Sequence, residues 1–198
     1  MQEYENETTG GRCGRSVHWA LDDQYVLTIS GKGPMKNYNT GEFDLAGNVP
    51  WENSQFMIVK IVIEEGVTSV GNFAFIDFAS MEEIDLPSTM QKIGKGAFDR
   101  CGSLKRIQLP ESLLEIEDFA FVDSGLEEVV LPAGLQKVGN GAFSFCRDLQ
   151  KITILNPDCK IDDAEKTLPK GALIVCHAHS AASEYAEKYG RRTEIIKE

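Results

Sequence analysis

The stretch from Met81 to Cys101, MEEIDLPSTMQKIGKGAFDRC, decides the fold because close copies of it precede and follow it. Its most recognisable part is an Ala-Phe pair, which recurs with Phe spacings of 23, 23 and 22 residues. The copies of this pair are Ala74-Phe75, Ala97-Phe98, Ala120-Phe121 and Ala142-Phe143. A second apolar column keeps the same register at Ile61, Ile84, Ile107, Val129 and Ile152. Two columns that share one period predict a repeat solenoid.

Each repeat predicts one coil of that solenoid. The alternation Ile84-x-Leu86 is typical of a short strand that is buried on one side. Proline follows at Pro87, and because it has no N–H to donate, it ends the strand. The rest of the coil, with its glycines and single Ala-Phe steps, favours turns and short 3₁₀ segments over a full helix. Stacked coils then form a parallel sheet, and the Phe side chains form a ladder through the core.

A stacked sheet leaves two apolar ends, and the sequence predicts a cap for each. At the amino-terminal end, alternation in residues 17–21 and a turn at 22–24 predict a β-hairpin whose second strand covers residues 26–30. At the carboxy-terminal end, Ser180 and Gly190 are the expected cap residues of an amphipathic helix over 181–189. A last strand is expected at residues 193–196.

The composition of the chain excludes some classes of partner. The 198 residues carry a net charge of −11, which repels phosphate backbones and makes nucleic acid a poor partner. No apolar run approaches the ~20 residues of a membrane-spanning helix, so membrane insertion is not expected. Residues 1–12 lack the features of a secretory signal, which fits a cytosolic protein or a mature secreted one.

The five cysteines are an odd number without a CxxC pair, so neither a disulfide framework nor a zinc knuckle is indicated. Cys101 and Cys146 occupy one column two coils apart, ~10 Å, which exceeds the ~7 Å Cα limit for a disulfide. Both are predicted to be buried free thiols. Pairing of Cys159 with Cys176 is left open.

The repeat, written L-x-x-I-x-L-P-x-x-[LM]-x-x-I-G-x-x-A-F-x-x-C, closely resembles the BspA-like leucine-rich repeat of surface proteins from gut and oral bacteria. Residues from Cys13 to Gly71 resemble the usual lead-in of this family, and residues 180–190 resemble its closing helix. The resemblance implies a leucine-rich-repeat solenoid of the α/β horseshoe type, at the cell surface or secreted, with a role in adhesion or host interaction. It implies no catalytic residues and no cofactor. Glu117 departs from the pattern by replacing a glycine, which indicates that this position does not require a positive φ.

The expected organisation is a single domain over residues 1–198. Residues 1–55 form the amino-terminal cap and lead-in loop, residues 56–156 the leucine-rich repeats, and residues 157–198 the carboxy-terminal cap.

The outward strand positions on the concave face are the first candidate for partner binding. One column alternates in charge, which predicts an ion-pair ladder across neighbouring strands. Its members are Lys60, Glu83, Arg106, Glu128 and Lys151. The adjacent column holds Val62, Asp85, Gln108, Val130 and Thr153. The ladder is interpreted either as a device that fixes register or as a polar floor for a ligand.

Two further candidates lie outside the strands. The long irregular segment from Gly31 to Asn53 carries Tyr38, Phe43 and Trp51, which either contact a partner or merely lead from cap to array. His177 and His179 form the only histidine cluster, and a His-x-His pair on a strand could hold zinc with a third ligand such as Cys159. Polar residues are common before a helix N-cap, so no metal is expected.

Three functions compete. The leading hypothesis is a non-catalytic surface or secreted module that binds a protein or glycan. A structural spacer in a surface assembly is the second, and the two caps argue against it. A metal-dependent enzyme at the carboxy-terminal cap is the third and depends on the histidine pair.

Overall fold

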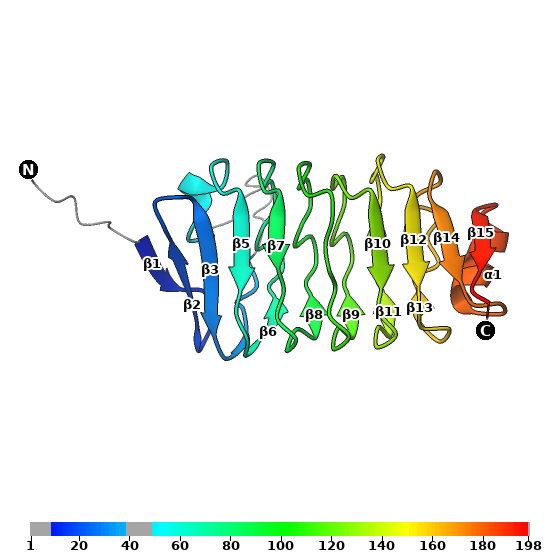
Figure 1. Ribbon diagram of the computed structural model, residues 1–198, viewed down its shortest axis with the longest axis horizontal. Coiled ribbons are helices and arrows are strands. Elements are labelled where there is room, and N and C mark those ends of the chain that lie inside the picture. Colours follow the sequence, from blue (N-terminus) through cyan, green and yellow to red (C-terminus); the bar gives the residue numbers. More distant parts are fainter. Residues whose placement is uncertain (1–8, 39–48, 198) are drawn as a thin grey trace, which may run out of the picture.

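The structure, a computed structural model, describes residues 9–38 and 49–197. It is an elongated stack of coils with a β-hairpin cap at one end and a helical cap at the other (Figure 1). This is the predicted leucine-rich-repeat solenoid. Two rows of parallel strands run along the stack, and the core lies between them.

The main row contains the strands that the Ile-x-Leu pattern predicted. Its members in the repeats are β5 (Lys60–Ile63), β7 (Glu83–Asp85), β10 (Glu128–Leu131), β12 (Lys151–Ile154) and β14 (Leu173–Cys176). In the parallel pairs, Lys60 lies opposite Glu83 and Glu128 lies opposite Lys151. The predicted columns are therefore in register in these pairs.

The return half of each coil contributes a second parallel sheet, where the sequence predicted only turns and 3₁₀ segments. Its order is β13-β11-β9-β8-β6-β4. The strands are β4 (Gly33–Pro34), β6 (Val67–Val70), β8 (Lys92–Ile93), β9 (Glu115–Ile116), β11 (Lys137–Val138) and β13 (Lys160–Ile161). The one 3₁₀ helix of the described residues is η1 (Glu52–Ser54). Most of these strands have only two residues, so an alternation of apolar and polar residues is too short to predict them from the sequence.

The caps have the predicted forms. At the amino-terminal end, β2 (Val17–Leu21) and β3 (Val26–Gly31) pair antiparallel, and β3 continues into the main sheet beside β5. An unpredicted edge strand, β1 (Thr9–Arg12), pairs with β2. At the other end, α1 (Ala181–Lys188) begins after Ser180, whose hydroxyl accepts from Ser183 N, and β15 (Arg192–Ile195) pairs with β14. Among the described residues no helix is long and apolar enough to cross a membrane.

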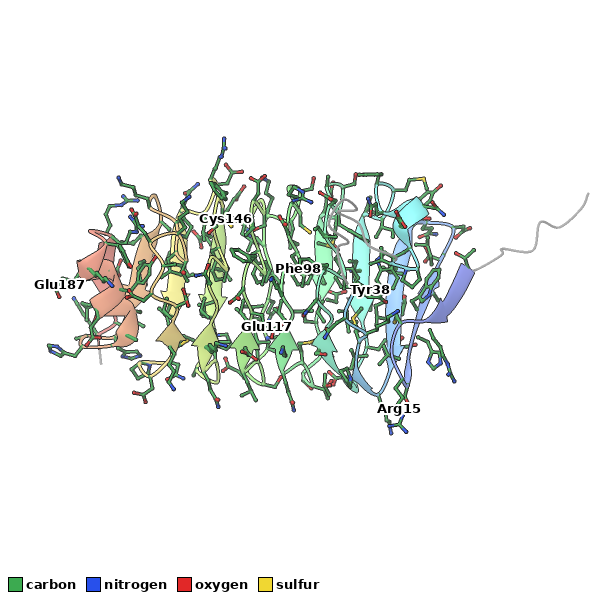
Figure 2. All side chains as sticks on the ribbon, turned by 180° about the vertical axis from the view of Figure 1, so that it is seen from behind. Arg15, Tyr38, Phe98, Glu117, Cys146 and Glu187 are labelled. Atoms are coloured by element: carbon green, nitrogen blue, oxygen red, sulfur yellow. The ribbon has the colours of Figure 1, made fainter. Side chains whose placement is uncertain are left out.

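The predicted Phe ladder is the centre of the core. Phe75, Phe98, Phe121 and Phe143 are fully buried and stack with ring centroids 5.7, 5.2 and 5.3 Å apart. In Figure 2, Phe98 lies within the width of the stack, whereas Arg15 and Glu187 lie at its periphery. Each Phe backbone N–H also bonds to the next coil, as Phe98 N does to Ala120 O at 2.8 Å. Stacking and backbone pairing thus hold neighbouring coils together.

The five cysteines are free and buried, as predicted for Cys101 and Cys146. The thiol of Cys146 donates to Phe121 O at 2.9 Å, and that of Cys101 donates to Phe75 O at 3.2 Å. Burial raises the pKa of both thiols. This column therefore fills space and satisfies carbonyl groups of the preceding coil.

Glycine in the column of Gly94 and Gly139 allows the preceding coil to pack closely against the backbone. A Cβ on Gly94 would lie 2.7 Å from Asn72 Oδ1. The left-handed conformation occurs instead in other columns, and in one of them phenylalanine alternates with glycine. Its members are Phe73, Gly96, Phe119 and Gly141, with φ of 55, 58, 60 and 59°. A Cβ on Gly96 would lie 2.5 Å from the Phe73 ring, so each ring covers the glycine of the next coil.

One predicted strand is missing. Residues 104–109 lie between β7 and β10 without regular structure, and the main row divides there into two sheets. Ile107 and Leu109 still face the core but are each 8% exposed, whereas Ile61 and Ile152 in the Ile107 column are at 0%. The apolar pattern fixes which side chains face inward, but it does not fix the distance between backbones of neighbouring coils. We call residues 104–109 and the flanking strands the sheet gap.

Candidate binding site

The sheet gap contains two hollows on the outer face of the main strands. The larger, about 500 Å³, lies between residues 106–109 and β10, and Arg106, Gln108, Glu128 and Val130 line it. The smaller, about 270 Å³, lies toward β7, and Gln108 lines it as well. Gln108 therefore stands between the two hollows, and the predicted face contributes most of the polar groups of the larger one.

The backbone at the sheet gap has hydrogen-bonding groups to offer. No backbone N–H or C=O of residues 106–109 takes part in a backbone hydrogen bond with another described residue. In contrast, Lys105 O still accepts from Glu127 N at 3.0 Å, so pairing stops immediately after residue 105. Because backbone groups seek partners, this segment suits a ligand that brings donors and acceptors of its own.

The predicted ion-pair ladder is wrong beyond its first rung. Lys60 Nζ lies 3.2 Å from Glu83 Oε2 and 3.0 Å from Asp85 Oδ2, and hydrogen bonds to Asp85 and then Glu83 raise the pKa of Lys60. Within residues 9–38 and 49–197, Arg106 has no carboxylate within ion-pair distance. For the rungs that involve Arg106, the reason is that the missing strand breaks the lateral contact that the ladder requires.

On the far side of the sheet gap, the column keeps its register without an ion pair. Glu128 lies opposite Lys151 and Val130 lies opposite Thr153. Val130 is 51% exposed and forms an apolar wall of the larger hollow. The charges here are free to meet a ligand rather than each other.

The expectation that Tyr38 and Trp51 contact a partner is corrected, because both are buried. Trp51 stacks on Phe75 at 5.5 Å between centroids and donates from Nε1 to Ala74 O at 3.0 Å. Tyr38 packs edge-on against Trp51. The two rings extend the Phe ladder toward the amino-terminal cap, and Trp19 also packs on Trp51. Phe43, the third residue of that set, lies outside the described residues.

The histidine pair does not have the geometry that zinc binding would need. His177 and His179 lie in a turn after β14 rather than on a strand, and His179 has a φ of 58°. Their side chains are therefore not held on one face as strand residues would be. Across residues 9–38 and 49–197, no group of three or more His, Cys, Asp or Glu side chains is placed to hold a metal ion.

Two residues of the larger hollow were missed by the sequence reasoning. Glu111 lies just after residues 104–109, and Pro132 directly follows β10. Glu111 follows the Leu109-Pro110 motif and Pro132 is the proline of Leu131-Pro132, so their places in the repeat could have suggested this.

The fold is that of a repeat solenoid, a class whose members act mainly by presenting an extended surface to partners. The sequence pattern of BspA-type leucine-rich repeat regions matches residues 52–164 in six copies. This match covers more than half of the 198 residues, and the chain belongs to that family. It is thus a repeat protein of a typically non-enzymatic, binding kind.

Similar solved structures agree with this assignment. A leucine-rich repeat protein from Eubacterium ventriosum is 25% identical, with a TM-score of 0.72 over 87% of this chain and 45% of that one. A leucine-rich repeat protein from Bacteroides ovatus is 17% identical, with a TM-score of 0.50 over 98% of this chain and 58% of that one. The chain therefore spans about half the length of these two proteins. The T. pallidum leucine-rich repeat protein is 21% identical, with a TM-score of 0.53 over 93% of this chain and 98% of that one. No curated protein matches the chain.

Proposed function

We propose that the chain is a cell-surface or secreted binding module whose sheet gap holds a protein or glycan partner. The observation that carries this proposal is the interruption of the main sheet at residues 104–109, which leaves two hollows on the outer face and backbone groups without a backbone partner. The free backbone groups favour an extended protein segment, because its own N–H and C=O groups are spaced to pair with them. The surface location is supported by the family, whose members are typically surface proteins.

The chemistry of the larger hollow supports a polar partner with one apolar group. Arg106, Gln108 and Glu128 offer both donors and acceptors, and Val130 offers an exposed apolar surface. A partner residue that covers Val130 would remove apolar area from water while its polar groups meet the surrounding side chains. No Ser, Thr, Cys, Lys or His side chain lines the larger hollow, so its chemistry supports binding rather than catalysis.

The test is a screen of the whole chain against extracellular-matrix proteins and a glycan array, followed by two matched variants. Val130→Arg fills the larger hollow, and Thr153→Arg places the same side chain at the opposite position on the next strand, outside it. We expect Val130→Arg to weaken the best interaction at least about tenfold, which is about 1.4 kcal/mol. Thr153→Arg should leave it nearly unchanged. Equal effects of the two variants, or no binding to any component, would contradict the proposal.

A further inference from the structure

A second pocket, of about 290 Å³, lies where the last repeat meets the carboxy-terminal cap. Residues 145–147, 165–166 and 168–171 form its walls together with Arg191, which follows α1. Its lining includes the cations Arg147, Lys166, Lys170 and Arg191 and a single carboxylate, Glu165. In a chain with a net charge of −11, this is a local reversal of sign. A cavity lined by one sign of charge concentrates ligands of the opposite sign.

Arg191 is the buried cation of this pocket and is held in place by hydrogen bonds. Its side chain is 2% exposed, and its guanidinium donates to Tyr189 O at 3.2 Å and to Glu165 O at 2.6 Å. Its Nε is buried and has no hydrogen-bond partner among the described residues. The nearest carboxylate oxygen, on Glu165, is 3.9 Å away on a side chain that is 66% exposed. A buried guanidinium with an unused N–H is costly unless an anion approaches, so this pocket suits an anionic group.

The pocket also has an aromatic wall. Phe145 is 56% exposed, and Lys166 Nζ lies 5.3 Å from the centre of its ring. A neighbouring hollow of about 460 Å³ shares Phe145, Glu165 and Lys166 with the pocket and adds Phe119, which is 40% exposed. The two cavities adjoin at these three residues, and we refer to them together as the groove, with cations at one end and flat apolar rings at the other.

Some backbone groups around this groove already have partners. Leu168 N donates to the Tyr185 hydroxyl at 3.2 Å, Lys166 O accepts from Ser144 Oγ at 2.8 Å, and Gly171 O accepts from Arg192 at 2.6 Å. A sugar ring can lay its C–H face on an aromatic side chain while a charged substituent meets the cations.

We infer that this groove binds an acidic saccharide. The sugar ring packs on Phe145, and its carboxylate or sulfate is received by Arg191 at the base of the pocket and by Arg147 and Lys170 at its rim. Charge-assisted hydrogen bonds to the anionic group provide most of the selectivity over neutral sugars. The site is independent of the sheet gap, so either proposal can fail without the other.

The experiment is calorimetric titration of the full chain with three short saccharides of equal length: trigalacturonic acid, a sulfated galactotriose and neutral galactotriose. We expect one or both acidic sugars to bind at least about tenfold more tightly than the neutral one, with an affinity that falls as salt is added. The two acidic arms show whether a carboxylate or a sulfate is preferred.

Variants locate the binding. Lys170→Gln removes an exposed cation, and Phe145→Asn removes the ring with a residue that tolerates the φ of 61° found there. Each should weaken binding at least about fivefold to tenfold, and Glu165→Gln should strengthen it, since it removes the one competing carboxylate. The matched control is Lys32→Gln, an exposed cation near the amino-terminal cap that lines neither the groove nor the sheet gap, and it should have no effect. Arg191 is left unchanged because it also holds the cap together.

The inference is overturned by any of four results. These are no binding of either acidic saccharide at millimolar concentration, equal binding of the neutral one, equal losses in Lys170→Gln and the Lys32→Gln control, or tighter binding of an acidic tripeptide than of the saccharides.

Discussion

Replacing Phe121 with alanine should remove a large part of the stability of the fold. The ring is fully buried, and its centroid lies 5.2 Å from that of Phe98 and 5.3 Å from that of Phe143. Deleting a buried Phe side chain usually costs about 3–5 kcal/mol, because transfer energy is lost and a cavity remains. Here two stacked pairs disappear as well, each worth about 0.5–1.5 kcal/mol, which places the expected loss near the upper end, about 4–5 kcal/mol. Since native domains are stable by only about 5–15 kcal/mol, this variant should be close to unfolding.

The assay is urea denaturation followed by circular dichroism, with two comparison variants. Phe143→Ala removes one stacked pair within the ladder instead of two, so it should cost about 0.5–1.5 kcal/mol less than Phe121→Ala. Phe56→Ala alters a ring that is 65% exposed and should change stability by no more than about 0.5 kcal/mol. If Phe121→Ala lowered the free energy of unfolding no more than Phe56→Ala, the ladder would not be the core of the stack.

Three other predictions concern charge and thiol chemistry. Burial raises the pKa of Asp99 to about 6 despite the opposing charge of Arg100, so the folded state binds this proton more tightly and loses stability as pH rises from ~4 to ~6. Asp99→Asn should therefore stabilise the fold by roughly 2–3 kcal/mol at pH 7 and have little effect at pH 4 in the same denaturation assay; stabilisation that does not depend on pH would contradict this account. Lys60→Glu should lower the urea midpoint because it reverses a paired charge, whereas Arg106→Glu should change the midpoint little. A larger effect of Arg106→Glu than of Lys60→Glu would instead support a continuous ion-pair ladder. Burial raises the pKa of Cys146 to about 11, so a chromogenic disulfide reagent at pH 8 should label it only after denaturant is added, and rapid labelling of the native protein would refute its burial.

The repeat register and the Phe ladder could be predicted from the sequence because one coil equals one period. Equivalent residues then stack whatever the details of the turns, and Phe75 and Phe98 are placed by their spacing alone. The carboxy-terminal helix was predicted to within one residue because Ser180 and Gly190 mark its ends by local backbone chemistry. These features depend on short-range rules that a single chain displays.

The sheet gap and the carboxy-terminal groove depend on distances between segments of the chain, and the repeat spacing does not determine these distances. The Ile107-x-Leu109 pattern predicts a strand. Whether this segment forms backbone hydrogen bonds within the main sheet depends on the spacing of the two neighbouring coils. Trp51 lies in an irregular segment, and only the fold shows that it continues the Phe ladder.

The sequence by itself thus determined which residues face the core and how the coils stack, because that information repeats along the chain. Only the tertiary structure decided where the main sheet opens and where Arg191 meets Lys170 and Phe145 around one pocket. Those arrangements bring together residues from separate coils and from the cap, and their packing is set by the whole molecule rather than by any one repeat.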